Sequence, residues 1–137
     1  MRALRSIAAV LAGFIAASLL MMLVESINGR VLYPGLAKAA EGVKDREAMR
    51  ALMATVPSGA LLVVIGGWTL GSLLGGWVAA RLAGRASTAH ALVLGGLLLL
   101  AGVANNLMLL PPTWFWIASL VVFLPAAHAG ARLAPAR

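Results

Sequence analysis

The residues of this sequence that could do chemistry inside a membrane are one acid and three amides. Glu25 follows a long apolar run, and Asn28 stands three residues later, so the two side chains share one side of a helix. Asn105 and Asn106 lie near the end of another apolar run. Carboxylates and amides are costly in lipid unless they are paired, so these residues mark either a ligand site or contacts between helices.

Two interpretations of these polar residues stay open. In the first, Glu25, Asn28 and one of the two adjacent asparagines form a pocket for a cation, a lipid headgroup or a small polar ligand. Only one asparagine is expected to face Glu25, because neighbouring helical residues point about 100° apart. In the second, the asparagines bond between helices and Glu25 is interfacial. The candidate ligand-binding residues are Glu25, Asn28, Tyr33, Asn105, Asn106 and Trp114, of which the two aromatics also suit an aromatic belt.

Other chemistry finds little support in the sequence. There are no cysteines, and Asp45 is the single aspartate, so thiolate sites and an aspartate dyad are excluded. His90 and His128 are too few ligands to specify zinc. We therefore expect no metal, no cofactor and no catalytic residue; an intramembrane enzyme built on Glu25 with an asparagine, Tyr33 or a histidine is the least favoured alternative.

The composition indicates that lipid surrounds most of the chain. Hydrophobic residues make up 62% and charged residues 11%, against roughly 45–50% and about 25% in soluble domains. The net charge of +7 comes from residues scattered over short loops and ends. Because nucleic-acid binding needs a clustered basic face, we expect the lipid bilayer, and no nucleic acid, as a partner.

Four apolar segments set the fold class. Residues 7–24 form an uncharged stretch of 18 residues, which spans about 27 Å as a helix and so matches a hydrocarbon core of roughly 30 Å. We predict an all-α membrane protein, a four-transmembrane-helix bundle that forms one domain over residues 1–137. Pro125 should kink the fourth span. The predicted spans are residues 5–27, 59–81, 88–110 and 114–131.

The loop between the first two spans contains a short amphipathic helix over residues 45–56. Met49, Leu52, Met53 and Val56 recur at helical spacing, and Asp45 can cap the start. Such a helix is expected to lie in the headgroup plane beside the bundle. A helix that binds a partner protein is the alternative.

Glycines predict how the spans hold together. Lipid offers no hydrophobic drive for helix association, so small residues must let backbones approach. Gly67, Gly71 and Gly75 recur every four residues in the second span, and Gly13 and Gly95 lie in small-residue stretches of the first and third. This ridge would serve packing within the chain or a homo-oligomer.

An even number of spans places both termini on one side. The terminal side holds six basic residues against five in the long loop, which favours cytoplasmic termini by the positive-inside rule. We expect the inner membrane of a bacterium. The six basic residues on the terminal side are Arg2, Arg5, Arg81, Arg85, Arg132 and Arg137.

The leading functional hypothesis is a non-enzymatic integral membrane protein that self-associates or accompanies a larger membrane complex. The alternative is a small transporter or ligand-binding protein that uses the polar pocket.

Overall fold

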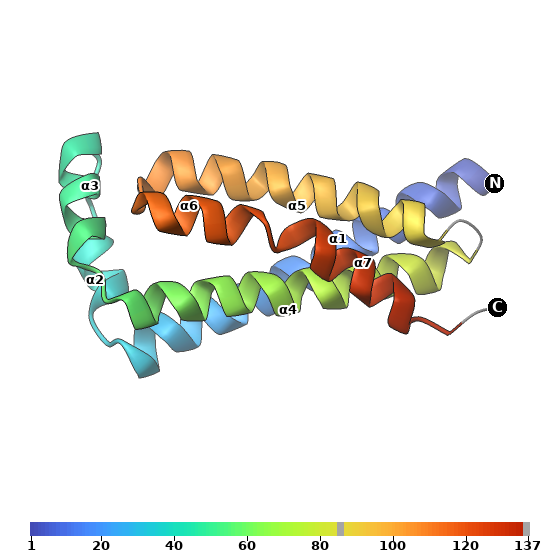
Figure 1. Ribbon diagram of the computed structural model, residues 1–137, viewed down its shortest axis with the longest axis horizontal. Helices are drawn as coiled ribbons and strands as arrows, with labels where there is room; N and C mark the ends of the chain where they lie inside the picture. The colour runs from blue at the N-terminus through green and yellow to red at the C-terminus, as the bar shows by residue number, and fades with distance from the viewer. Residues whose placement is uncertain (85–86, 136–137) are drawn as a thin grey trace.

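The computed structural model describes residues 1–84 and 87–135, and these residues form helices joined by short turns, with no strand among them (Figure 1). Arg85 and Arg137, counted above for the orientation, lie outside this part. The helices are α1 Arg2–Ile27, the π-helix η1 Asn28–Leu32, α2 Leu36–Ala40, α3 Arg46–Thr55, α4 Ser58–Ala83, α5 Ser87–Leu109, α6 Thr113–Leu120 and α7 Phe123–Leu133.

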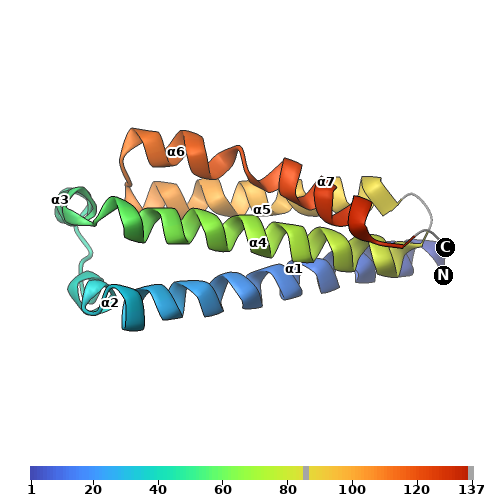
Figure 2. The ribbon, with the colours of Figure 1, turned by 60° about the horizontal axis from the view of Figure 1, so that its bottom comes forward.

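Four helical stretches are long and apolar enough to cross a membrane, which confirms this part of the predicted fold class. They are Arg2–Leu32, Ser58–Ala83, Ser87–Leu109 and Thr113–Leu133. The long helices run side by side, and both termini lie at the same end of the molecule (Figures 1 and 2). The first stretch continues to Leu32, five residues beyond the predicted end at residue 27, because η1 prolongs α1 without a break.

Small residues of α1 are buried and its large ones face outward. Ala9, Gly13 and Ala17 are buried at a spacing of four residues, whereas Leu11 and Ile15 are exposed. This arrangement reverses that of a soluble protein. It suits lipid, where large apolar side chains need no cover and small ones let two backbones meet.

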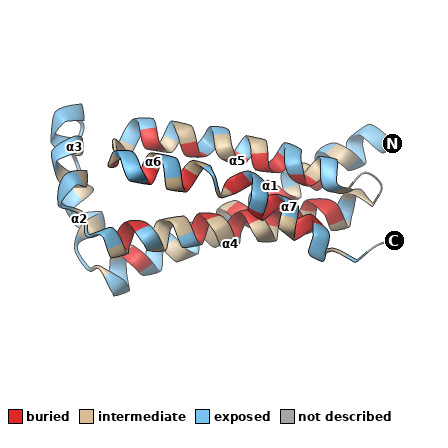
Figure 3. Ribbon diagram, in the orientation of Figure 1, coloured by how far each residue is buried: buried red, intermediate tan, exposed pale blue. Residues whose placement is uncertain are grey.

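The helix α4 lies at the centre of the bundle and packs against α1 on one side and α7 on another. The ridge of Gly67, Gly71 and Gly75 faces α1; a Cβ added at Gly75 would lie 2.7 Å from the carbonyl oxygen of Gly13. Gly76 faces α7, where a Cβ would clash with the Ala127 carbonyl. Buried residues therefore run along most of α4 (Figure 3).

The fourth apolar segment is two helices rather than one kinked helix. α6 ends at Leu120 and α7 begins at Phe123, two residues before Pro125. Proline has no N–H to donate to the carbonyl four residues earlier, here that of Val121, so the ladder is interrupted at that point. The break places Phe123 in the core, where its ring stacks on Trp68 with centroids 5.2 Å apart.

The predicted amphipathic segment is α3, and Asp45 caps it as expected: the Ala48 N–H donates to Asp45 Oδ2 at 3.0 Å. α3 lies across the end of the bundle remote from the termini (Figure 1). Its apolar residue Met53 and the adjoining Val56 pack against the core. The short helix α2, not predicted, follows the left-handed Gly35 and lies beside η1.

Candidate ligand-binding site

A cavity of about 360 Å³ lies at the end of the bundle that α2 and α3 cover. It is present because α1 diverges from α5 and α6 toward this end (Figure 2). Its wall is mostly apolar, with Leu52 and Met53 from α3, Val64 from α4 and Leu109 from α5. The polar residues in the wall are Glu25, Asn28 and Asn105. We call this space the main cavity.

A second cavity of about 200 Å³ adjoins the first deeper in the bundle. Its wall includes Phe14, Leu98 and Phe123, and it shares Glu25 and Asn105 with the main cavity. These two polar residues therefore stand where the two cavities meet.

Glu25 lies deeper along the bundle than its place after the first apolar run suggested. Its Oε1 accepts a hydrogen bond of 2.9 Å from the indole Nε1 of Trp68. Trp68 comes ten residues after Ser58, the start of α4, which is about 15 Å along the helix axis. No basic side chain pairs with Glu25 among residues 1–84 and 87–135. The carboxylate is thus held by one N–H donor and keeps acceptor capacity on the exposed side of the residue.

Asn28 is the buried polar residue of the main cavity, with 5% of its surface exposed. It begins η1, and its Nδ2 donates to the Ala60 carbonyl oxygen at 2.9 Å. A carbonyl can only accept, so the amide orientation is fixed and the remaining atom is Oδ1. This Oδ1 is buried and has no hydrogen-bond partner within the described residues. π-Helical turns of this kind are frequent at functional sites.

The two adjacent asparagines have different surroundings. Asn105 lines both cavities together with Glu25. Asn106 is fully buried on another side of α5, where its Nδ2 donates to Ser119 Oγ at 3.1 Å. The Ser119 hydroxyl donates in turn to the Trp116 carbonyl at 3.3 Å. Asn106 therefore links α5 to α6, which is the interhelical role that the second interpretation gave to both residues.

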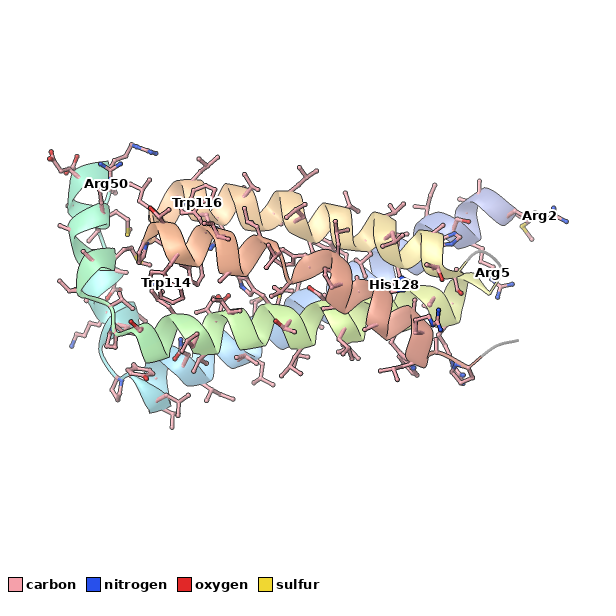
Figure 4. All side chains as sticks on the ribbon, viewed as in Figure 1. Arg2, Arg5, Arg50, Trp114, Trp116 and His128 are labelled. Carbon is pink, nitrogen blue, oxygen red and sulfur yellow. The ribbon has the colours of Figure 1, made fainter. Side chains whose placement is uncertain are left out.

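The two aromatic candidates lie outside the wall of the main cavity. The Tyr33 hydroxyl lies against Gly59, where an added Cβ would clash with it. Trp114 is 40% exposed and meets Phe115 edge-on at 6.1 Å. Trp114 and Trp116 both lie in the part of the bundle beside α3, whereas Arg2 and Arg5 mark the other end (Figure 4). This placement suits surface aromatics better than ligand contacts.

The glycines named from the sequence lie at helix contacts of the same chain. Gly13, Gly67, Gly71 and Gly75 lie between α1 and α4, and a Cβ on Gly95 would lie 3.1 Å from the Ala127 Cβ in α7. The sequence analysis assigned no role to Gly130. A Cβ there would clash with the Leu73 carbonyl, which makes Gly130 the α7 counterpart of Gly76.

Trp68 is the residue of the site that was not predicted from the sequence. A usable signal existed, because a buried indole N–H needs an acceptor and few acceptors are available in an apolar helix. No group of three or more potential metal ligands occurs among the described residues. No protein-family model, curated protein or solved structure matches the chain.

Proposed function

We propose that this chain is an integral membrane protein that binds a single-chain amphiphile in the main cavity and catalyses no reaction. The observation that carries the proposal is the composition of the wall. Fewer than one in four of its residues are polar, and the polar ones are Glu25 of α1, Asn28 of η1 and Asn105 of α5.

The size and shape of the cavity support a small ligand. Small-molecule sites typically enclose about 300–1,000 Å³ and combine apolar walls with a few placed polar groups. The main cavity falls at the lower end of this range. In our proposal the apolar chain lies along Leu52, Met53, Val64 and Leu109, and the head group lies toward Glu25.

The helices α2 and α3 cover the cavity, and in our proposal they lie at the membrane surface. α3 has an apolar side that packs on the core and a polar side with Arg46, whose Nη1 donates to the Leu107 carbonyl at 3.3 Å. This bond holds α3 over the end of α5. An amphiphile that enters from the bilayer between α1 and α5 would thus lie beneath an interfacial helix, with its chain in apolar surroundings.

The proposal is tested with a photoreactive amphiphile that has a hydroxyl head and a diazirine in its chain. The protein is labelled in phosphatidylcholine nanodiscs and the labelled peptides are mapped. We expect label at Leu52, Met53 and Leu109 in excess of label at the exposed Leu11 and Ile15, which report bulk lipid. Even labelling of all these positions would rule out a site.

A matched pair of variants in α2 tests whether the label depends on the cavity. Ala37 lines the main cavity and Ala39 does not, and both are exposed. Ala37→Trp should fill part of the cavity from the side of α2 and reduce cavity labelling several-fold, whereas Ala39→Trp should leave it unchanged. Equal labelling of the two variants would contradict the proposal.

Self-association and membership of a larger complex remain predictions. The glycine ridge of α4, for which packing within the chain and a homo-oligomer were the two expected uses, is covered by α1 of the same chain. Transport through the cavity, rather than binding alone, is likewise a prediction that the amphiphile experiment leaves open.

A further inference from the structure

We propose that the head group selected by the main cavity is a protonated amine that keeps its N–H donors, as in a primary alkylamine or an ethanolamine lipid. This inference rests on the function proposed above and adds the chemical class of the ligand. The free acceptor positions of the Glu25 carboxylate and the charge of the cavity wall carry it.

The Glu25 carboxylate can only accept hydrogen bonds. It has a single donor, the indole of Trp68, and carboxylate oxygens offer about four lone-pair sites. An occupant that bonds to the free positions of this carboxylate must therefore bring donors, and an ammonium group brings three.

The charge of the wall points in the same direction. Glu25 is the only charged residue among those that line the cavity, and the wall contains no Lys, Arg or His within the described residues. An anionic head group would meet a carboxylate with no cation to offset it, and repulsion is strong where water is scarce. A cationic head group instead forms a charge-assisted hydrogen bond, which is about twice as strong as a neutral one.

N–H donors, and not charge alone, should matter because a charge-assisted hydrogen bond to the free Glu25 oxygens needs a donor hydrogen on the ligand. A quaternary ammonium has no N–H and is bound instead by several aromatic faces. Among the described residues of the wall, Phe115 is the one aromatic side chain, so these residues form no such cage.

The head-group preference is measured by competition against the photoreactive amphiphile in the wild-type protein. The competitors share a dodecyl chain and end in a primary amine, a trimethylammonium, a hydroxyl or a carboxylate, and each concentration is corrected for partition into the nanodisc. We expect the primary amine to displace the label at least about tenfold better than the others, equivalent to about 1.4 kcal/mol. Equal competition by the trimethylammonium or the alcohol would overturn the inference.

The same experiment separates failure of this inference from failure of the proposed function. Cavity labelling with no head-group preference would support the amphiphile site and contradict the preference for an amine. Absence of cavity labelling would contradict both the proposed function and this inference. Nanodiscs in which phosphatidylethanolamine replaces phosphatidylcholine identify the source of the amine. Lower labelling there indicates a lipid headgroup, and unchanged labelling with competition by dodecylamine indicates a free amine.

A charge-matched pair of variants assigns the preference to Glu25. Glu25→Gln keeps an oxygen that can accept from Trp68 but removes the charge, so the advantage of dodecylamine over dodecanol should fall by about tenfold. Glu41→Gln makes the same charge change at an exposed position outside the wall and should keep the advantage. If the Glu25→Gln protein keeps the full advantage of dodecylamine over dodecanol, the inference is wrong. If that variant does not fold, the competitor series on the wild-type protein still tests the inference.

Discussion

The two halves of this bundle are packed in different ways. In the half near the termini, which we call the packed half, backbones touch: Gly13 and Gly75 face each other between α1 and α4, and Gly76 and Gly130 lie between α4 and α7. In the half beneath α3, which we call the hollow half, α1 diverges from α5 and leaves the main cavity (Figure 2).

The polar residues follow the same division. In the packed half small residues make the contacts, and van der Waals packing is what lipid allows two helices to gain. In the hollow half Glu25, Asn28 and Asn105 take the place of small residues, and the buried amide oxygens of Asn28 and Asn106 have no hydrogen-bond partner among the described residues. The backbone contacts of Gly75 with Gly13 and of Gly76 with Ala127 thus lie away from the main cavity, which leaves the half beneath α3 with room to hold a ligand.

The largest expected effect comes from a methyl group placed in the packed half. In Gly76→Ala the Cβ would clash with the Ala127 carbonyl, and backbone atoms cannot move aside. We expect the free energy of unfolding to fall by about 3 kcal/mol, measured by circular dichroism during SDS titration of the detergent-solubilised protein.

Gly66→Ala is the control in the same helix, because a Cβ there meets nothing within 4 Å. It should leave stability unchanged or raise it by up to about 1 kcal/mol, the difference in helix propensity between glycine and alanine. Equal losses in the two variants would show that the packed half is not held by backbone contact.

A smaller effect should separate the two buried asparagines. Asn106→Ala removes the bond to Ser119 in a fully buried place, so unfolding free energy should fall by about 1–2 kcal/mol while cavity labelling stays the same. Asn28→Ala should reduce cavity labelling several-fold, measured with the same photoreactive amphiphile. If Asn106→Ala reduced labelling as much as Asn28→Ala, the division between structural and ligand-binding polar groups would be wrong.

The sequence was sufficient to predict the helices but not how each helix is rotated about its axis against its neighbours. Apolar length alone identifies the four spans, and helical spacing after Asp45 identifies α3 with its cap. The pairing of Glu25 with Trp68 depends on how far α1 slides and turns against α4, and that is decided by where Gly13 and Gly75 meet. Spacing within one helix contains no information on this register.

The backbone structure at the ends of the helices was also not predictable from the sequence. η1 widens the turn that begins at Asn28, where the Tyr33 N–H donates to the Asn28 carbonyl oxygen at 2.8 Å, and nothing in the sequence indicates this turn. Asn28 itself still bonds to the Val24 carbonyl as in a regular helix, so Glu25 and Asn28 line the same cavity, in agreement with their spacing of three. Pro125 predicted that the fourth span is not a regular helix. Whether a proline bends or interrupts a helix depends on the neighbours that cover the freed carbonyl, which the sequence does not give.

The smallest expected effect lies at the cover of the hollow half. Asp45→Ala removes the acceptor that caps α3, which costs about 1 kcal/mol locally. Hydrogen exchange at the amides of the first turn of α3 should become about fivefold faster, with no change in global unfolding, because α3 is not part of the packed half. Asp45→Asn is the matched control, since asparagine caps as well as aspartate. If α3 covers the ligand, labelling of Leu52 and Met53 should change in Asp45→Ala while labelling of Leu109 does not; a change in global stability instead would show that the two halves are coupled through α3.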